Sequence, residues 1–160
     1  MKELVATAGK IAAKLIERRQ TIAVAESSTG GLISAALLAV PGASAYFLGG
    51  GVIYTRDARR ILMDIPDEAM KGIRSASEPY AKLLASQIRR RFATDWGLSE
   101  TGATGPTGNR YGDVAGHSCM GVAGAEVSVM TLETGSADRL ANMHVFASTA
   151  LNFLLQNLSR

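Results

Sequence analysis

The chain of 160 residues contains little cysteine, little proline and no long run of apolar residues. Its one cysteine, Cys119, excludes an internal disulfide and favours a reducing, cytoplasmic environment. No apolar stretch reaches the length of a membrane-spanning helix, and the first ten residues, MKELVATAGK, lack the apolar core of a signal peptide. We therefore expect a cytoplasmic protein that makes no contact with a membrane.

Charge is also sparse, since 19% of the residues are charged and the net charge is only +3. The sole basic run, Arg89 to Arg91, lies in a helical pattern and is typical of a solvated helix face, so we expect no nucleic-acid partner. No cluster of cysteine and histidine indicates a metal site, and we expect no cofactor. His117 and His144 are predicted to be structural or surface residues, and Cys119 a buried, unreactive thiol.

The apolar pattern predicts helices and strands that alternate along most of one domain, residues 1–160. Helices are expected at 3–19, 29–39, 56–63, 77–94 and 136–158. Strands are expected at 21–25 and 45–54, from Trp96 onward, and at 118–124 and 126–133, with the last two forming a hairpin. This order predicts an α/β fold, a three-layer α/β/α domain with a mixed sheet of about five strands.

Polar loops follow the first three predicted strands: ESSTGG, YTRDAR and TGATGPTG. Because the carboxyl ends of parallel strands meet at one edge of a sheet, we expect these loops to converge on one pocket. Gly30 and Gly31 would let the backbone approach a ligand, and free amides there would favour an anion. The alternative is that a hydroxyl of Ser27, Ser28 or Thr29 caps the following helix, and the spacing alone favours this cap over a nucleophile or an anion-binding loop.

Five motifs, in order, resemble the C-terminal domain of the competence/damage-inducible CinA proteins: AESSTGG, PGASAYF, YTRDAR, SASEP and TGATGP. The family pattern reads Ala-Glu-Ser-Cys-Thr-Gly-Gly, Pro-Gly-Ser-Ser with an aromatic residue, Tyr-Ser-Asn-Glu-Ala-Lys, Ala-Val-Ser-Glu and Thr-Gly-Ile-Ala-Gly-Pro. The resemblance covers nearly the whole chain. The family includes nicotinamide mononucleotide amidohydrolases, which use a Ser/Lys pair to release ammonia from the carboxamide, so the resemblance implies a small-molecule nucleotide substrate.

The resemblance also implies roles for particular residues. The nucleophile falls on Ser27, and the other catalytic positions are Ser44, Tyr54, Arg59 and Thr101. The implied substrate-binding residues are Glu26, Thr29, Gly30, Gly31, Gly102, Gly105 and Pro106. Backbone amides of these loops would serve as donors to the oxyanion or to the substrate phosphate.

The chain departs from the family where relatives carry positive charge. Arg59 stands at the family lysine, and a guanidinium cannot accept a proton from Ser27, although it can hold a carboxylate or phosphate or stabilise an oxyanion. Asp113 stands at a second lysine position, and Ala137 is matched to an arginine. Two hypotheses follow: an amidohydrolase of low activity, with Tyr54 or Asp57 as an alternative base, or a catalytically silent paralogue that binds a nucleotide or a protein partner.

Two apolar segments favour a homo-oligomer. One is the glycine-rich FLGGGVIY, and the other is the final helix, with Leu151, Phe153, Leu154, Leu155 and Leu158. The alternative is that both segments pack within the core of one chain.

Overall fold

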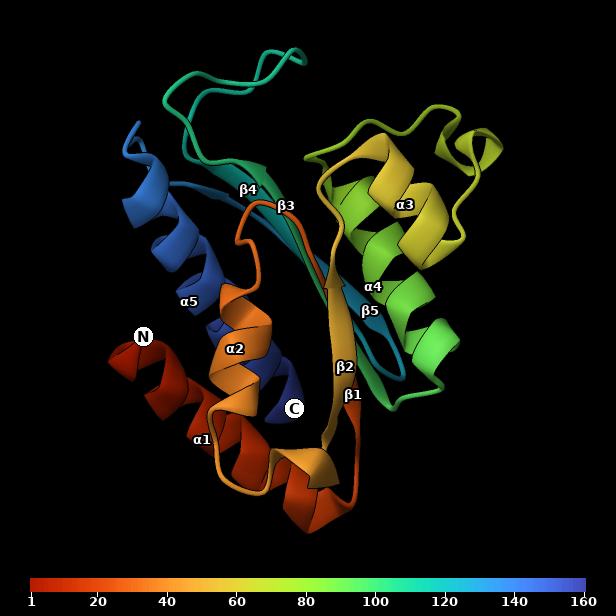
Figure 1. Ribbon diagram of the computed structural model, residues 1–160, viewed down its shortest axis with the longest axis vertical. Helices are drawn as coiled ribbons and strands as arrows, with labels where there is room; N and C mark the ends of the chain where they lie inside the picture. The colour runs from red at the N-terminus through yellow and green to blue at the C-terminus, as the bar shows by residue number, and fades with distance from the viewer.

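A five-stranded mixed sheet organises the molecule, described by a computed structural model of residues 1–160 (Figure 1). The strands are β1 (Ile22–Glu26), β2 (Phe47–Val52), β3 (Trp96–Ala103), β4 (His117–Ala123) and β5 (Val127–Glu133). Their order across the sheet is β2-β1-β3-β4-β5. β1 runs parallel to β2 and to β3, whereas β3, β4 and β5 are antiparallel neighbours. The predicted mixed sheet and terminal hairpin are confirmed.

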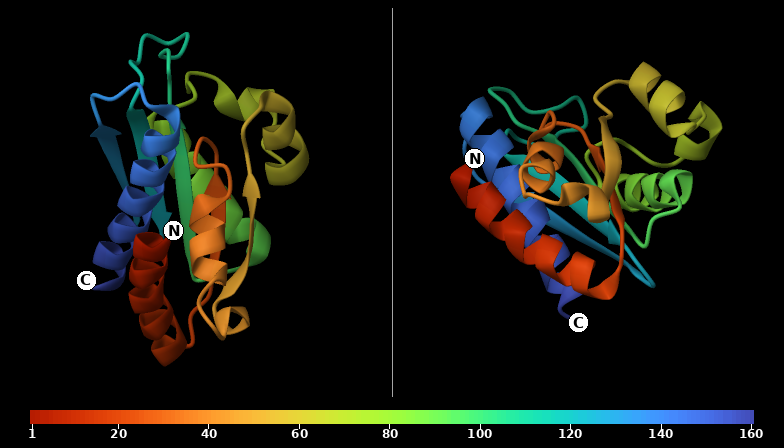
Figure 2. Two further views of the ribbon diagram at one scale, coloured as in Figure 1. Left: turned by 60° about the vertical axis from the view of Figure 1, so that its left-hand side comes forward. Right: turned by 60° about the horizontal axis from the view of Figure 1, so that its bottom comes forward.

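Helices cover both faces of this sheet, which gives the predicted α/β/α layers (Figures 1 and 2). One layer contains α1 (Lys2–Arg18), α2 (Leu32–Leu38) and α5 (Arg139–Leu158), and the other contains α3 (Arg56–Met63) and α4 (Glu78–Phe92). Two short 3₁₀ helices, Ala43–Ala45 and Asp67–Met70, lie in connections. No helix is both long enough and apolar enough to cross a membrane.

Alternation along β1 supplies side chains to both layers. Ile22 and Val24 belong to the larger core, with α1, α2 and α5, whereas Ala23 and Ala25 belong to the smaller core beneath α3 and α4. Small residues on the face of the sheet beneath α3 and α4 let α4 lie close to it. A Cβ atom added at Gly97 of β3 would lie 2.2 Å from the carbonyl oxygen of Ala85 in α4. The central strands β1 and β4 are therefore buried on both faces, and the loops at the strand ends are left to form a site.

The apolar side of α5 packs inside the chain. Leu151, Phe153, Leu154 and Leu158 belong to the larger core, and Leu155 packs against it. The part of the oligomer argument that rested on this helix is therefore wrong, because one chain already covers those side chains. On β2, an edge strand, Leu48 and Val52 remain exposed.

The largest differences from the predicted boundaries are at α2, α5 and β2. α2 begins at Leu32 rather than near Thr29, α5 begins at Arg139 rather than at Ser136, and β2 is shorter than 45–54. The start of α4 is as expected, because the Ser77 hydroxyl accepts a hydrogen bond from the amide of Tyr80 at 3.3 Å. The later start of α2 leaves Ser27–Gly31 as a loop beyond the end of β1, and that loop contributes to the site.

Candidate functional site

Glu26, the last residue of β1, caps α2 with its buried carboxylate. Its Oε2 accepts hydrogen bonds from the amide of Ile33 at 2.9 Å and from the Thr29 hydroxyl at 3.0 Å, while Oε1 accepts from the amide of Ser34 at 3.3 Å. Burial raises the pKa of the Glu26 carboxyl, and these bonds oppose the increase. The expectation that a hydroxyl of Ser27, Ser28 or Thr29 caps the helix is wrong, since the cap is supplied from the strand end.

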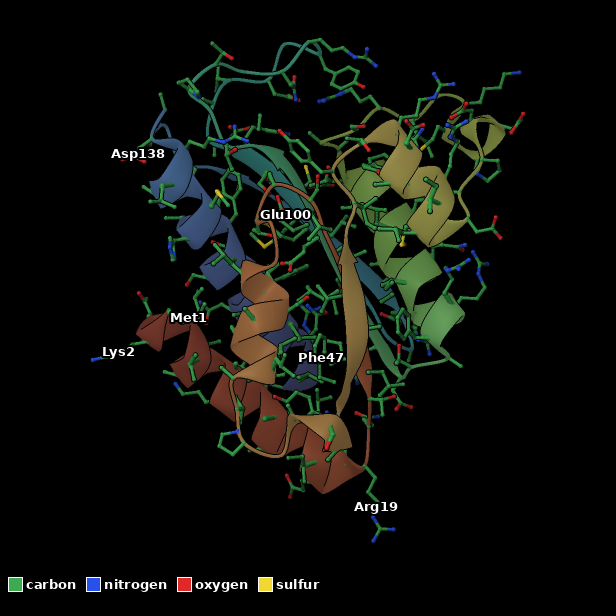
Figure 3. All side chains as sticks on the ribbon, in the orientation of Figure 1. Met1, Lys2, Arg19, Phe47, Glu100 and Asp138 are labelled. Atoms are coloured by element: carbon green, nitrogen blue, oxygen red, sulfur yellow. The ribbon has the colours of Figure 1, made fainter.

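A second buried carboxylate, Glu100 on β3, holds the loop after β1. Its Oε2 accepts from the amides of Ser27 at 3.1 Å and Thr29 at 3.0 Å and from the Thr29 hydroxyl at 3.0 Å. Its Oε1 accepts from the hydroxyls of Ser28 and Ser118. Figure 3 labels Glu100 beside this loop. Sequence reasoning missed Glu100, although a glutamate inside the strand segment GLSETGA was a signal that its carboxylate would need donors.

These two carboxylates distinguish Ser27 from its neighbours. The Ser28 and Thr29 hydroxyls are both engaged by Glu26 or Glu100, but the hydroxyl of half-buried Ser27 makes no hydrogen bond and faces a pocket. The amide N–H of Ser28 also has no hydrogen-bond partner. A free hydroxyl beside a free amide is the pairing that acyl transfer requires of a nucleophile and an oxyanion donor.

The pocket, of about 410 Å³, lies at the carboxyl ends of the parallel strands. Its walls are Ser27, Ile53, Tyr54, Thr55, Arg56, Arg59, Ser75, Ala76, Tyr80, Thr101, Gly102, Asn109, Arg110 and Tyr111. All three polar loops contribute, so the predicted convergence on one pocket is confirmed. The walls include three arginines and no carboxylate, lysine or histidine.

Arg59 is the buried cation of this pocket. Its side chain is 9% exposed, and its guanidinium lies 6.0 Å from the centre of the Tyr80 ring. Only Nη2 donates a hydrogen bond, to Asp67 Oδ1 at 3.3 Å, and buried Nε has no partner. Asp67 is also bound by Arg56, whose Nε lies 3.0 Å from Oδ1. Arg59 therefore keeps unused donors beside the pocket.

Tyr80 was not predicted from the sequence and forms part of the pocket wall. Burial raises the pKa of its hydroxyl, although the charge of Arg59 opposes the increase. Tyr80 is therefore a proton donor at neutral pH rather than a base. Asp57, one of the alternative bases, lies outside the pocket: its side chain is 71% exposed and paired with Arg60.

A second hollow, of about 270 Å³, adjoins the first and shares Tyr54, Gly102 and Asn109 with it. Arg139 lies in its wall, where Nη1 donates to the carbonyl oxygen of Gly105 at 2.6 Å and Nη2 to the Tyr54 hydroxyl at 3.3 Å. Sequence reasoning matched the family arginine to Ala137 and missed Arg139. The run Ala137-Asp138-Arg139 was the signal, since it fits the Gly-Asp-Arg pattern when the match is moved by two residues.

Thr101 is joined to His117 through the backbone of Ala76. The amide of Ala76 donates to the Thr101 hydroxyl at 3.2 Å, and His117 Nε2 donates to the Ala76 carbonyl at 2.8 Å. His117 Nδ1 donates to the Glu133 carboxylate. Burial alone would lower the pKa of His117, but these two contacts and the charges of Asp113 and Glu133 together outweigh it and raise the pKa. Both ring nitrogens face acceptors, an arrangement that favours the imidazolium form, and through Nε2 the ring fixes the pocket wall at Ala76.

Several sequence-predicted residues lie elsewhere. Ser44 is exposed in the 3₁₀ helix before β2, at the opposite end of the parallel strands from Ser27, so one chain does not bring it to the pocket. The reason is that the Pro41–Gly42 turn follows α2 at that end. Other predicted binding residues outside the main pocket are Glu26, Thr29, Gly30, Gly31, Gly105 and Pro106, of which Gly105 lines the second hollow.

Three further polar residues singled out by the sequence or paired with such a residue, Asp113, Arg74 and Cys119, line neither hollow. Asp113 forms an ion pair with Arg74, whose Nη2 lies 3.0 Å from Oδ1, and this contact holds the pKa of Asp113 below its usual value. Cys119 is buried, and burial raises the pKa of its thiol, which fits the prediction of an unreactive cysteine. No group of three or more histidine, cysteine, aspartate or glutamate side chains is arranged to hold a metal.

Comparisons with known proteins agree on one family. The model of the CinA C-terminal domain matches residues 5–158. A CinA-like protein of Trichodesmium erythraeum is 34% identical over 160 residues, which are 98% of this chain and 37% of that protein. A CinA-like protein of Synechococcus sp. (strain CC9902) is 42% identical over 110 residues, 69% of this chain and 26% of that protein. This chain thus spans about a quarter to a third of the length of these curated relatives.

Solved structures give the same result for the fold. The competence damage-inducible protein A of Klebsiella pneumoniae superposes with a TM-score of 0.92 at 23% identity, covering 98% of both chains, and is similar in fold. The competence/damage-inducible protein of Agrobacterium tumefaciens has a TM-score of 0.90 at 26% identity, covering 99% of this chain and 96% of its own.

Proposed function

The chain belongs to the CinA C-terminal domain family, and we propose that it is a serine amidohydrolase acting on the carboxamide of nicotinamide mononucleotide. The observation that carries the proposal is the free hydroxyl of Ser27, which faces a pocket next to the unpartnered amide of Ser28. A pocket of about 410 Å³ is large enough to hold a mononucleotide.

The proposed reaction proceeds through an ester on Ser27. The Ser27 oxygen attacks the carboxamide carbon, and the Ser28 amide stabilises the negative charge that forms on the carbonyl oxygen. The C–N bond breaks, ammonia leaves with the proton lost from the serine, and a nicotinoyl ester remains. Water then cleaves the ester to give nicotinate mononucleotide and the free serine. No oxidant, reductant or metal is required.

The weak point of this chemistry is the removal of the serine proton. Arg59 occupies the position of the family lysine, and an arginine remains protonated in a protein. The other titratable side chains of the pocket are tyrosines and two further arginines. We therefore propose a low turnover, because general-base assistance contributes about a hundredfold to ten-thousandfold to such reactions.

The same observation favours a second candidate function. A pocket with three arginines and no carboxylate, lysine or histidine is suited to binding an anion without chemistry, as in a catalytically silent paralogue that binds a nucleotide or a protein partner. The two candidates differ in a single measurable property, since only the enzyme releases ammonia in a reaction that depends on Ser27.

Ammonia release from nicotinamide mononucleotide tests the proposal. The wild-type protein is expected to release ammonia slowly, and Ser27→Ala to abolish the reaction. Ser86→Ala is the control, because Ser86 lies on α4, makes no side-chain hydrogen bond and lines neither hollow. Equal rates for the wild type and Ser27→Ala would contradict the proposed mechanism and favour the silent paralogue.

A further inference from the structure

The charge of the main pocket is unbalanced. Its walls contain Arg56, Arg59 and Arg110 and no acidic side chain. The nearest compensation is Asp67, which is shared between Arg56 and Arg59. Arg110 is directed at Tyr111, with its guanidinium 5.1 Å from the ring centre. One aspartate thus serves two of the three cations, and the pocket keeps an excess of positive charge.

Arg59 differs from the other two arginines in its burial. Arg56 has a side chain that is 69% exposed, so water can satisfy its donors, whereas that of Arg59 is 9% exposed. Nε of Arg59 has no hydrogen-bond partner and no contact with solvent, and Nη1 has no partner within the protein. Buried polar groups of folded proteins nearly always have partners. Arg59 has a single long hydrogen bond, to Asp67, and the donors left over at this depth indicate a group that is supplied by a ligand.

The surroundings of Arg59 favour a ligand over an internal partner. Its helix, α3, buries Arg59 together with Met63, which fixes the stem of the side chain in the smaller core. The head reaches the same pocket as Ser27 and Thr101. The planar guanidinium of arginine can bind a carboxylate or phosphate through two parallel hydrogen bonds, which the ammonium of lysine cannot, and it is the more weakly hydrated cation. Its position is therefore suited to binding an oxyanion within the pocket.

We propose that Arg59 is the anion receptor of this pocket and that the ligand carries a phosphate or carboxylate group bound to it. The inference deepens the proposed function, because it rests on the same pocket and assigns Arg59 to substrate binding rather than to proton transfer. Nicotinamide mononucleotide has a phosphate group. Nicotinamide riboside, the nucleoside that lacks this phosphate, does not.

Direct binding of simple anions is the first test. Inorganic phosphate and acetate are each added to the whole chain at constant ionic strength, with chloride as the reference salt, and thermal unfolding is recorded. A ligand that binds only the folded chain raises the melting temperature. We expect one of the two anions to raise it beyond chloride, and which one does so identifies the group as phosphate or carboxylate.

Variants assign the effect to Arg59. Arg59→Gln is expected to abolish the increase in melting temperature, and Arg59→Met, which keeps the apolar stem, serves if the first variant unfolds. Arg60→Gln is the matched control, because Arg60 lies next in the same helix, pairs with Asp57 and does not line the pocket. An increase that persists in the Arg59 variants, or no increase over chloride with either anion in the wild type, would overturn the proposal.

Calorimetric titration then separates this inference from the proposed function. The wild type is expected to bind nicotinamide mononucleotide at least tenfold more tightly than the riboside, and Arg59→Gln to bind both equally. If simple anions bind through Arg59 but no ammonia is released from the mononucleotide, the anion receptor stands and the amidohydrolase proposal fails. Equal affinity of the wild type for the mononucleotide and the riboside would contradict a role for Arg59 in holding the phosphate.

Discussion

Removal of the Glu100 carboxylate is predicted to destabilise the fold and to disorder the loop that carries Ser27. Glu100 accepts five hydrogen bonds, of which two come from the backbone amides of Ser27 and Thr29. Glu100→Ala leaves both amides unpaired in a buried place, at about 1–3 kcal/mol for each unsatisfied group. We therefore expect the free energy of unfolding to fall by about 4 kcal/mol.

Glu100→Gln is a milder version of the same perturbation. One amide oxygen can still accept from both backbone amides, while the NH₂ group faces the hydroxyls of Ser28 and Ser118, which can rotate to accept. Only the charge assistance of the bonds is lost, and charged hydrogen bonds exceed neutral ones by about 1 kcal/mol each. The expected cost is about 2 kcal/mol, half that of Glu100→Ala.

Thermal and urea unfolding measure both values. In a chain of this length each kcal/mol corresponds to about 2–4 °C in melting temperature, so the alanine variant should melt about 8–16 °C below the wild type. Glu126→Ala is the control, since Glu126 is exposed in the turn between β4 and β5 and its carboxylate makes no hydrogen bond. Melting temperatures of both Glu100 variants within 2 °C of the wild type would refute the structural role assigned to Glu100.

Three further predictions concern the pocket wall and the surface. Folding raises the pKa of His117, so its contribution to stability is fully present below the unfolded pKa of about 6.5 and is lost as pH rises through the folded pKa. The difference in free energy of unfolding between wild type and His117→Gln, measured in urea, should therefore be larger at pH 6 than at pH 8.5, with His144→Gln as the control. A difference independent of pH would contradict an imidazolium. Light scattering at micromolar concentration should give the mass of an oligomer for the wild type and a smaller mass for Leu48→Asp on the exposed edge of β2, whereas a wild-type monomer would refute oligomerisation. Arg139→Gln should raise the KM for the nucleotide about tenfold, since Arg139 fixes the Tyr54 hydroxyl and the Gly105 loop, and an unchanged KM would show that the second hollow has no part in binding.

Hydrophobic periodicity and loop composition were sufficient to predict the fold and the location of the pocket. Side chains of a strand such as β1 point alternately to the two faces of the sheet, and the apolar residues of a helix recur every three or four positions. These two periods are visible in the sequence and predict the fold. The three polar loops were found for a related reason: each follows a strand, and parallel strands end at the same edge. The loops at Ser27, Tyr54 and Gly102 were accordingly predicted to share one pocket, and they do, whereas Arg59 and Thr101 were added by the resemblance.

The partners of polar side chains could not be predicted in the same way. Glu26 and Glu100 act on donors that lie up to 73 positions away in the chain or on a neighbouring helix turn, and periodicity contains no information on such pairing. The cap of α2 was therefore assigned to the hydroxyls instead of to Glu26. Ser44 was grouped with Ser27 on the resemblance alone, although the predicted strand at 45–54 already placed Ser44 before that strand and thus at the opposite end of the parallel strands.

Turnover of nicotinamide mononucleotide by Arg59→Lys tests the central claim most directly. A lysine at position 59, when partly desolvated, can lose its own proton and then accept that of Ser27, which the guanidinium of Arg59 cannot do. The account predicts slow ammonia release by the wild type, a rate at saturating substrate that is about a hundredfold higher for Arg59→Lys, and no release by the double variant Ser27→Ala/Arg59→Lys. Vigorous release by the wild type, or release by the double variant, would contradict it.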